Sequence, residues 1–128
     1  MASFLTEAWV EALAAALGSL PERAGATAVV QHVVSGTPHG EVRYHLSIID
    51  GRVGSAGLGE VEEADLRCTT SYPDALRLAR GDVAVHEAFM QGKLKMVGST
   101  GRLMDLLPVL GSDDHRQALA GLSAATQY

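Results

Sequence analysis

Histidine, cysteine and carboxylate side chains are the usual parts of a catalytic or metal site, and this chain of 128 residues has five His, one Cys and fifteen Asp plus Glu. The histidines are His32, His39, His45, His86 and His115. No two of them, and no pair of cysteines, have the spacing that places two ligands on one metal. We interpret the histidines as surface or capping residues and Cys68, which alternates with Arg67 and Thr69, as a buried structural thiol. The pattern therefore predicts no catalytic residue, no metal and no cofactor.

Two glycine-rich stretches have some features of phosphate-binding loops. The first, residues 54–59, precedes an acidic stretch in place of a helix, so it lacks the context of a dinucleotide site. The second, Gly98-Ser-Thr-Gly101-Arg102, lies between a predicted strand and a predicted helix, where backbone N–H groups could hold a headgroup or a coenzyme A phosphate. It lacks the Lys-Ser/Thr ending of a phosphate loop. A plain helix cap at Ser99 or Thr100 is the favoured interpretation.

Charge and length exclude several classes of protein. The net charge is −5 and no basic run occurs, which argues against a nucleic-acid partner. The length predicts one domain, residues 1–128, able to bury its own core. The lone cysteine and the absence of a leader pattern at the start predict a cytoplasmic protein. No run of residues is apolar enough to span a membrane. The last residues do not match a peroxisomal targeting signal.

The first half of the chain predicts one helix and four strands. A helix over 4–17, capped by Ser3, has leucines and Trp9 at spacings of three and four. Strands are predicted over 26–34, 41–49, 52–56 and 65–70, because β-branched residues or alternating apolar positions recur there. Asp50-Gly51 is typical of a two-residue hairpin turn, and the glycines of the third strand suggest an edge or a bulge.

The second half predicts four helices and one strand. Pro73 and Gly81 bound a helix over about 73–80, Asp82 caps a helix ending at Met90, and Lys93 to Val97 alternate as a strand. Helices over about 101–110 and 114–125 follow. The predicted fold is α+β: a five-stranded, mainly antiparallel sheet covered on one face by helices, in the order α-β-β-β-crossover-β-α-α-β-α-α.

Three stretches resemble a known family. They are Ser71-Tyr-Pro-Asp-Ala-Leu-Arg-Leu-Ala-Arg-Gly81, Glu87-Ala-Phe-Met-Gln-Gly-Lys-Leu-Lys-Met-Val-Gly98 and Leu103-Met-Asp-Leu-Leu-Pro-Val-Leu110. They strongly resemble the core of the sterol carrier protein type-2 family, small lipid-binding domains, and the run from Ala88 to Lys95 is the most specific part. The resemblance implies the same order of elements and an apolar tunnel that accepts fatty acids, fatty acyl-coenzyme A, sterols or isoprenoids. It also implies a ligand contact at Gln91.

An apolar constellation in the second half is the candidate binding site. From the residues alone, Met and Leu at helical spacing are typical of a packed core. The resemblance implies that the same residues border the tunnel, which the C-terminal helix would gate. The expected ligand-binding residues are Phe89, Met90, Gln91, Leu94, Met96, Leu103, Met104, Leu106, Leu107, Leu110, Leu119 and Leu122.

Three functions are compatible with these patterns. The leading hypothesis is non-catalytic binding and transfer of a lipid or other apolar small molecule, with transient membrane contact. The alternative is an enzyme or accessory protein that acts on an apolar intermediate of specialised metabolism in the same pocket, with Tyr44 or His45 as general acid or base. A plain interaction module with a filled core is the third, and it would have no cavity.

Overall fold

Five strands form one sheet in the computed structural model, which describes residues 1–128. In sheet order they are β4 (Arg52–Leu58), β3 (Gly40–Ile49), β2 (Ala28–Thr37), β5 (Leu66–Ser71) and β6 (Leu94–Gly98). All neighbours are antiparallel except β2 and β5, which run parallel. A parallel neighbour cannot be reached by a tight turn, so the chain crosses from the β4 edge to the far side of β2. The predicted mainly antiparallel sheet with a crossover is confirmed.

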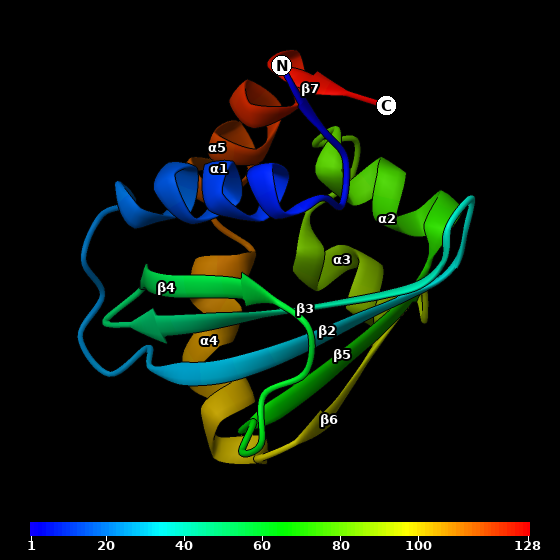
Figure 1. Cartoon of the computed structure of the whole chain (residues 1–128). Coiled ribbons are helices and arrows are strands. Elements are labelled where there is room, and N and C mark those ends of the chain that lie inside the picture. The colour runs from blue at the N-terminus through cyan, green and yellow to red at the C-terminus, as the bar shows by residue number, and fades with distance from the viewer.

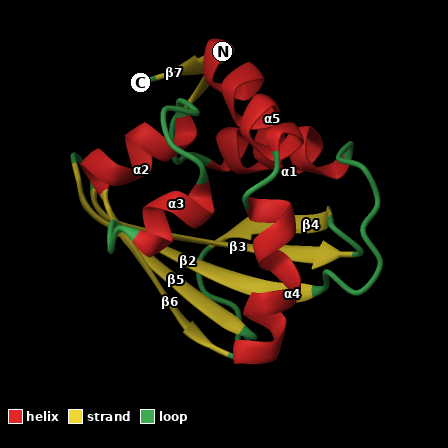
Figure 2. Cartoon of the chain, turned by 180° about the vertical axis from the view of Figure 1, so that it is seen from behind, coloured by secondary structure: helices red, strands yellow, loops and turns green.

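Five helices cover one face of this sheet (Figures 1 and 2). They are α1 (Glu7–Gly18), α2 (Tyr72–Ala79), α3 (Val85–Met90), α4 (Thr100–Leu110) and α5 (Asp113–Ala124). None of them has both the length and the apolar character that crossing a bilayer requires. The apolar stripe of α1 is buried at Trp9, Leu13 and Leu17, so the predicted buried face of this helix is confirmed.

The uncovered face of the sheet is polar. Arg43 forms ion pairs of 2.8 Å with Glu41 and Glu60 there, and all three side chains are partly exposed. Gln31 and Val33 are buried on this face, and the Gln31 side chain bonds the crossover to the sheet. Its amide Nε2 donates to the carbonyl of Gly59 (3.1 Å), and its Oε1 accepts from the N–H of Val61 (2.7 Å).

The structure confirms the predicted hairpin turn, edge strand and helix cap. Asp50 and Gly51 have φ of 49° and 84°, the left-handed values that a two-residue hairpin turn needs. The glycine-containing strand β4 is an edge strand, and its pairing with β3 shifts register between Ser47 and Ile48, as a bulge does. Ser99 caps α4 by accepting from the N–H of Arg102 (3.3 Å), which confirms a plain helix cap in the second glycine-rich stretch.

Two predicted helix starts are wrong. The first helix begins at Glu7, and its N-cap is Thr6, not Ser3. Ser3 belongs to the short strand β1 (Ala2–Ser3), which pairs in parallel with β7 (Thr126–Gln127), so a partner at the far end of the chain decides its conformation.

The start of α3 is the second error. This helix begins at Val85, after the N-cap Ala84, which forms no side-chain cap bond. The N–H of Asp82 donates to the carbonyl of Arg77 (3.0 Å), so Asp82 ends α2 instead of starting α3.

The close approach of β6 to the start of β5 generates a stability prediction. Gly98 has φ of +139°, and an added Cβ would lie 2.2 Å from the carbonyl oxygen of Asp65. Gly98→Ala is therefore expected to lower the free energy of unfolding by at least about 2 kcal/mol, measured by urea denaturation. The matched control is Gly121→Ala on α5, where nothing lies within 4 Å. It should raise stability by about 0.5–1 kcal/mol. Equal stability of the two variants would contradict the claim that only glycine fits at position 98.

Candidate functional site

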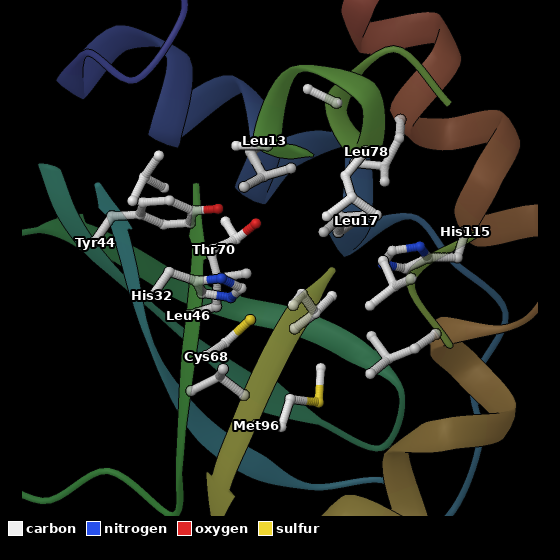
Figure 3. A pocket seen from close by; sticks show the side chains of 18 of the residues that line it. Leu13, Leu17, His32, Tyr44, Leu46, Cys68, Thr70, Leu78, Met96 and His115 are labelled. Carbon is white, nitrogen blue, oxygen red and sulfur yellow. The ribbon is translucent and has the colours of Figure 1, made fainter. Parts of the chain in front are cut away.

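An apolar cavity of about 110 Å³ lies between the sheet and the helices (Figure 3). A single buried water needs only about 10–15 Å³, so the space exceeds ordinary packing defects several-fold. All five helices and the covered face of the sheet contribute to its wall, α3 through Val85. Most lining residues are hydrophobic, among them Leu13, Leu17, Val30, Val34, Leu46, Leu66, Leu78, Leu94 and Leu106.

One row of side chains crosses the floor of the cavity. Strand pairing places Tyr44 opposite His32, His32 opposite Cys68, and Cys68 opposite Met96, on β3, β2, β5 and β6 in turn. Laterally paired residues of a sheet project to the same side, and all four line the cavity. The neighbouring rows are mainly aliphatic, so the polar groups are concentrated in this one row.

The two ring side chains of this row stack on each other. The ring centroids of His32 and Tyr44 are 4.5 Å apart and their planes differ by 2°. Trp9 of α1 contacts the same tyrosine edge-on at 5.6 Å. His115, which is 7% exposed, lies on α5 and reaches the cavity from the side away from Tyr44 (Figure 3).

These ring side chains have no hydrogen-bond partner within the protein. His32 and Tyr44 accept bonds from Gln31 only at their backbone carbonyls, and His115 donates only through its backbone N–H, to Ser112. Thr70 differs, because its hydroxyl donates to the carbonyl of Lys93 at 3.2 Å. The cavity wall therefore holds polar atoms whose bonding capacity is unused.

Burial keeps these groups uncharged at neutral pH. It lowers the pKa of His32 to about 4, with His115 adding to the effect, and lowers the pKa of His115 to about 4. It raises the pKa of the Cys68 thiol to about 12 and, with a smaller effect of Cys68, raises the pKa of the Tyr44 hydroxyl. No Asp, Glu, Lys or Arg lines the cavity. The site thus offers hydrogen bonds without a permanent charge.

The structure divides the twelve residues of the predicted binding site into two groups. Five line the cavity: Leu94, Met96, Leu106, Leu110 and Leu119. Phe89, Leu103, Leu107 and Leu122 are half-buried outside its lining, and Gln91 is exposed. Met90 and Met104 are 79% and 61% exposed, because they lie on the outer sides of α3 and α4.

Several lining residues come from the first half of the chain, which the sequence prediction left out. Helix α1 and strands β2 and β3 supply Leu13, Leu17, His32, Tyr44 and Leu46. The interpretation of the histidines as surface or capping residues is wrong for His32 and His115. Both had a signal in the sequence: one alternates with Val30 and Val34 on an apolar strand face, and the other precedes Leu119 by four residues on a helix.

The two candidate acid–base residues on β3 point to opposite faces of the sheet. Tyr44 faces the cavity. His45 lies on the uncovered side, where its Nδ1 is 3.3 Å from the carbonyl of Gly59. Only the tyrosine is therefore placed to meet a bound molecule.

The covered sheet and its internal cavity define a small α+β domain with an uncharged apolar interior. The chain belongs to the SCP-2 sterol transfer family, whose model matches residues 10–111. Family membership implies binding and transfer of lipids in general. A comparison with curated protein sequences finds no match.

Solved structures are similar across most of the chain. A crystal structure of sterol carrier protein 2 has 21% identity and a TM-score of 0.69, over 94% of this chain and 97% of that one. A conserved hypothetical protein from Thermus thermophilus, described as possibly a sterol carrier protein, has 18% identity and a TM-score of 0.72, over 95% and 91%. Palmitated SCP2L2 from Aedes aegypti has 19% identity and a TM-score of 0.62, over 81% and 92%. At these identities the likeness establishes the fold.

The buried histidines generate a prediction for the pH dependence of stability. A histidine of the unfolded chain has a pKa near 6.5, so between pH 6.5 and 4 the unfolded state binds protons that His32 and His115 do not bind in the folded state. The free energy of unfolding should fall across this window by up to about 3 kcal/mol per histidine. Urea denaturation of the ligand-free protein at pH 7, 6 and 5 measures the loss.

The control variants separate the two buried histidines from the rest. His115→Leu should remove about half of the loss, whereas His39→Asn in an exposed loop should keep it. Stability that stays level from pH 7 to 5 would show that neither imidazole is buried in the neutral form.

Proposed function

We propose that this protein binds one lipid molecule in its apolar cavity and transfers it between membranes without altering it. The ligand is of the fatty acid, fatty acyl-coenzyme A, sterol or isoprenoid class. The observation that carries this proposal is the unfilled apolar space between the sheet and the helices. Burial of about fifteen methylene groups contributes roughly 12 kcal/mol before costs, and association removes half or more. Micromolar affinity follows without any catalytic group.

Catalysis in the same cavity is the second candidate, because Tyr44 faces the enclosed space. General acid–base catalysis works best with groups whose pKa lies near the operating pH. Burial instead raises the pKa of Tyr44 and lowers the pKa of His32 to about 4, so each is held in one uncharged form at neutral pH. These shifts favour a carrier over an enzyme.

A second hollow suggests where the ligand passes in and out. It has a volume of about 380 Å³ and lies beside the chain termini, and Phe4 and Leu5 form part of the wall of both hollows. The Phe4 ring packs 5.2 Å from Tyr128 of the C-terminal segment and 4.9 Å from Trp9. Displacement of this aromatic side chain joins the two hollows into a tunnel, with the C-terminal segment as part of the gate.

Transfer also requires contact with a membrane surface. Met90 and Met104 present exposed apolar side chains on α3 and α4, two helices that contact each other. Such side chains insert readily among lipid headgroups. The proposal therefore includes transient membrane contact through these helices.

A pair of methionine substitutions tests the cavity. Met96 lines it, whereas Met104 is exposed. Met96→Trp fills the space and should weaken binding of a fluorescent fatty acid to delipidated protein at least about tenfold, since the chain loses the volume it occupies. Met104→Trp should bind as the unaltered protein does. Fluorescence titration gives the affinities and circular dichroism verifies the fold, and an unchanged affinity of a folded Met96→Trp variant argues against the cavity as the site.

A second pair tests the passage. Phe4→Ala should increase the rate of ligand release severalfold, because it removes the ring between the two hollows, and stopped-flow transfer of fluorescent lipid to acceptor vesicles measures this rate. Phe89→Ala removes a half-buried ring outside the cavity lining and is the matched control. Equal rates in both variants would place the passage elsewhere.

A further inference from the structure

Several polar side chains in the cavity wall have no hydrogen-bond partner, which indicates that the ligand is more than a hydrocarbon chain. Tyr44 is 8% exposed, and its hydroxyl forms no bond within the protein although it lies in a cavity wall. The ring nitrogens of its stacked neighbour His32 and of the opposing His115 line the same cavity and also form no hydrogen bond within the protein. A purely apolar guest would leave all three side chains unsatisfied, which costs free energy for each group shielded from water.

We infer that the ligand carries an uncharged oxygen function, a hydroxyl or a ketone, and that it binds with this function inside the cavity against His32 and Tyr44. This inference rests on the proposed function and narrows it to one class of ligand. The apolar body of the ligand then extends from the polar row toward the aliphatic wall, where Leu13, Leu46 and Leu106 lie.

The chemistry of the paired rings fits such a group. A neutral imidazole has one N–H donor and one acceptor nitrogen, and a phenol both donates and accepts. Strand pairing and stacking hold the two rings in place, so their polar atoms need no reorganisation to meet a ligand oxygen. A ketone accepts from either ring, and a hydroxyl both accepts and donates.

A charged head does not fit. The cavity has no Lys or Arg to pair with a carboxylate or a phosphate, and burial of an unpaired charge is far more costly than burial of an alcohol. An ion pair would require His32 to take up a proton, against the burial that lowers its pKa to about 4. An ionised lipid is therefore expected to bind more weakly than an uncharged lipid of equal chain length.

The test compares four molecules with ten-carbon chains at pH 7.5: decane, 1-decanol, 2-decanone and decanoate. Displacement of a fluorescent apolar probe from delipidated protein gives their affinities. Decanol and decanone should bind at least about tenfold more tightly than decanoate. Tyr44→Phe keeps the stacked ring and removes only the hydroxyl, so it should weaken decanol and decanone about three- to tenfold and leave decane unchanged.

The matched control is Tyr72→Phe, which removes a hydroxyl from the wall of the second hollow and not from that of the cavity. A passage affects the rates of binding and release and not the equilibrium affinity, so this variant should change none of the four affinities. The infrared band of the decanone carbonyl gives a direct readout. It should lie at lower frequency in the complex than in alkane, and Tyr44→Phe should reverse part of the shift.

The outcomes separate this inference from the proposed function. Four similar affinities that Tyr44→Phe does not change, or decanoate as the tightest ligand, would overturn the inference and leave lipid binding intact. Failure of every molecule and of the probe to bind would instead overturn the proposed function.

Discussion

Coverage of one sheet face by short helices is the constraint on which the rest of this structure depends. The covered face of the strands carries many small or β-branched side chains, such as Val30, Val34 and Thr70, and these do not reach far toward the helices. Close packing is the normal state of a protein interior. The leucines of α1, α4 and α5 that face the sheet nevertheless do not fill the space between the two layers. These core residues, which stabilise the fold, therefore also line the cavity.

The parallel pairing of β2 with β5 determines what lies on the cavity floor. It places Cys68 beside His32, and the antiparallel neighbour β3 places Tyr44 on the other side. The crossover that makes this pairing possible is bonded to the outer face through Gln31. Gln31 on the outer face thus holds the crossover that positions β5, and with it Cys68, beside His32 on the cavity face.

The two faces of the sheet differ in whether their ionisable side chains are charged. On the outer face, Arg43 and its carboxylate partners remain charged because water reaches them. On the inner face, burial favours the neutral forms of imidazole, phenol and thiol. The fold thus separates a solvated ionic surface from an interior that has a few polar groups but no charged ones. This separation is the physical basis for the uncharged ligand that we propose.

The termini form a weakly held part of the structure beside the cavity. Strands β1 and β7 pair over only two residues each, Ala2 with Thr126 and Ser3 with Gln127. Short ladders at chain ends open at lower free-energy cost than the core of a sheet. The proposed passage beside Phe4 therefore lies at a part of the structure that opens at low free-energy cost.

The sequence by itself determined the order and type of the five helices and of the five strands of the main sheet, but not the short strands β1 and β7. It also determined the Asp50-Gly51 hairpin, the buried face of α1 and the family, because turn chemistry, apolar periodicity and short motifs are local properties. It also indicated five of the residues that line the cavity. Only the tertiary structure decided that Ser3 pairs with the C-terminal segment and that His32, Tyr44 and His115 meet at one enclosed space. The physical reason is that strand order and the facing of sheet and helix depend on contacts between distant residues, and a pattern of spacings within one segment does not encode them.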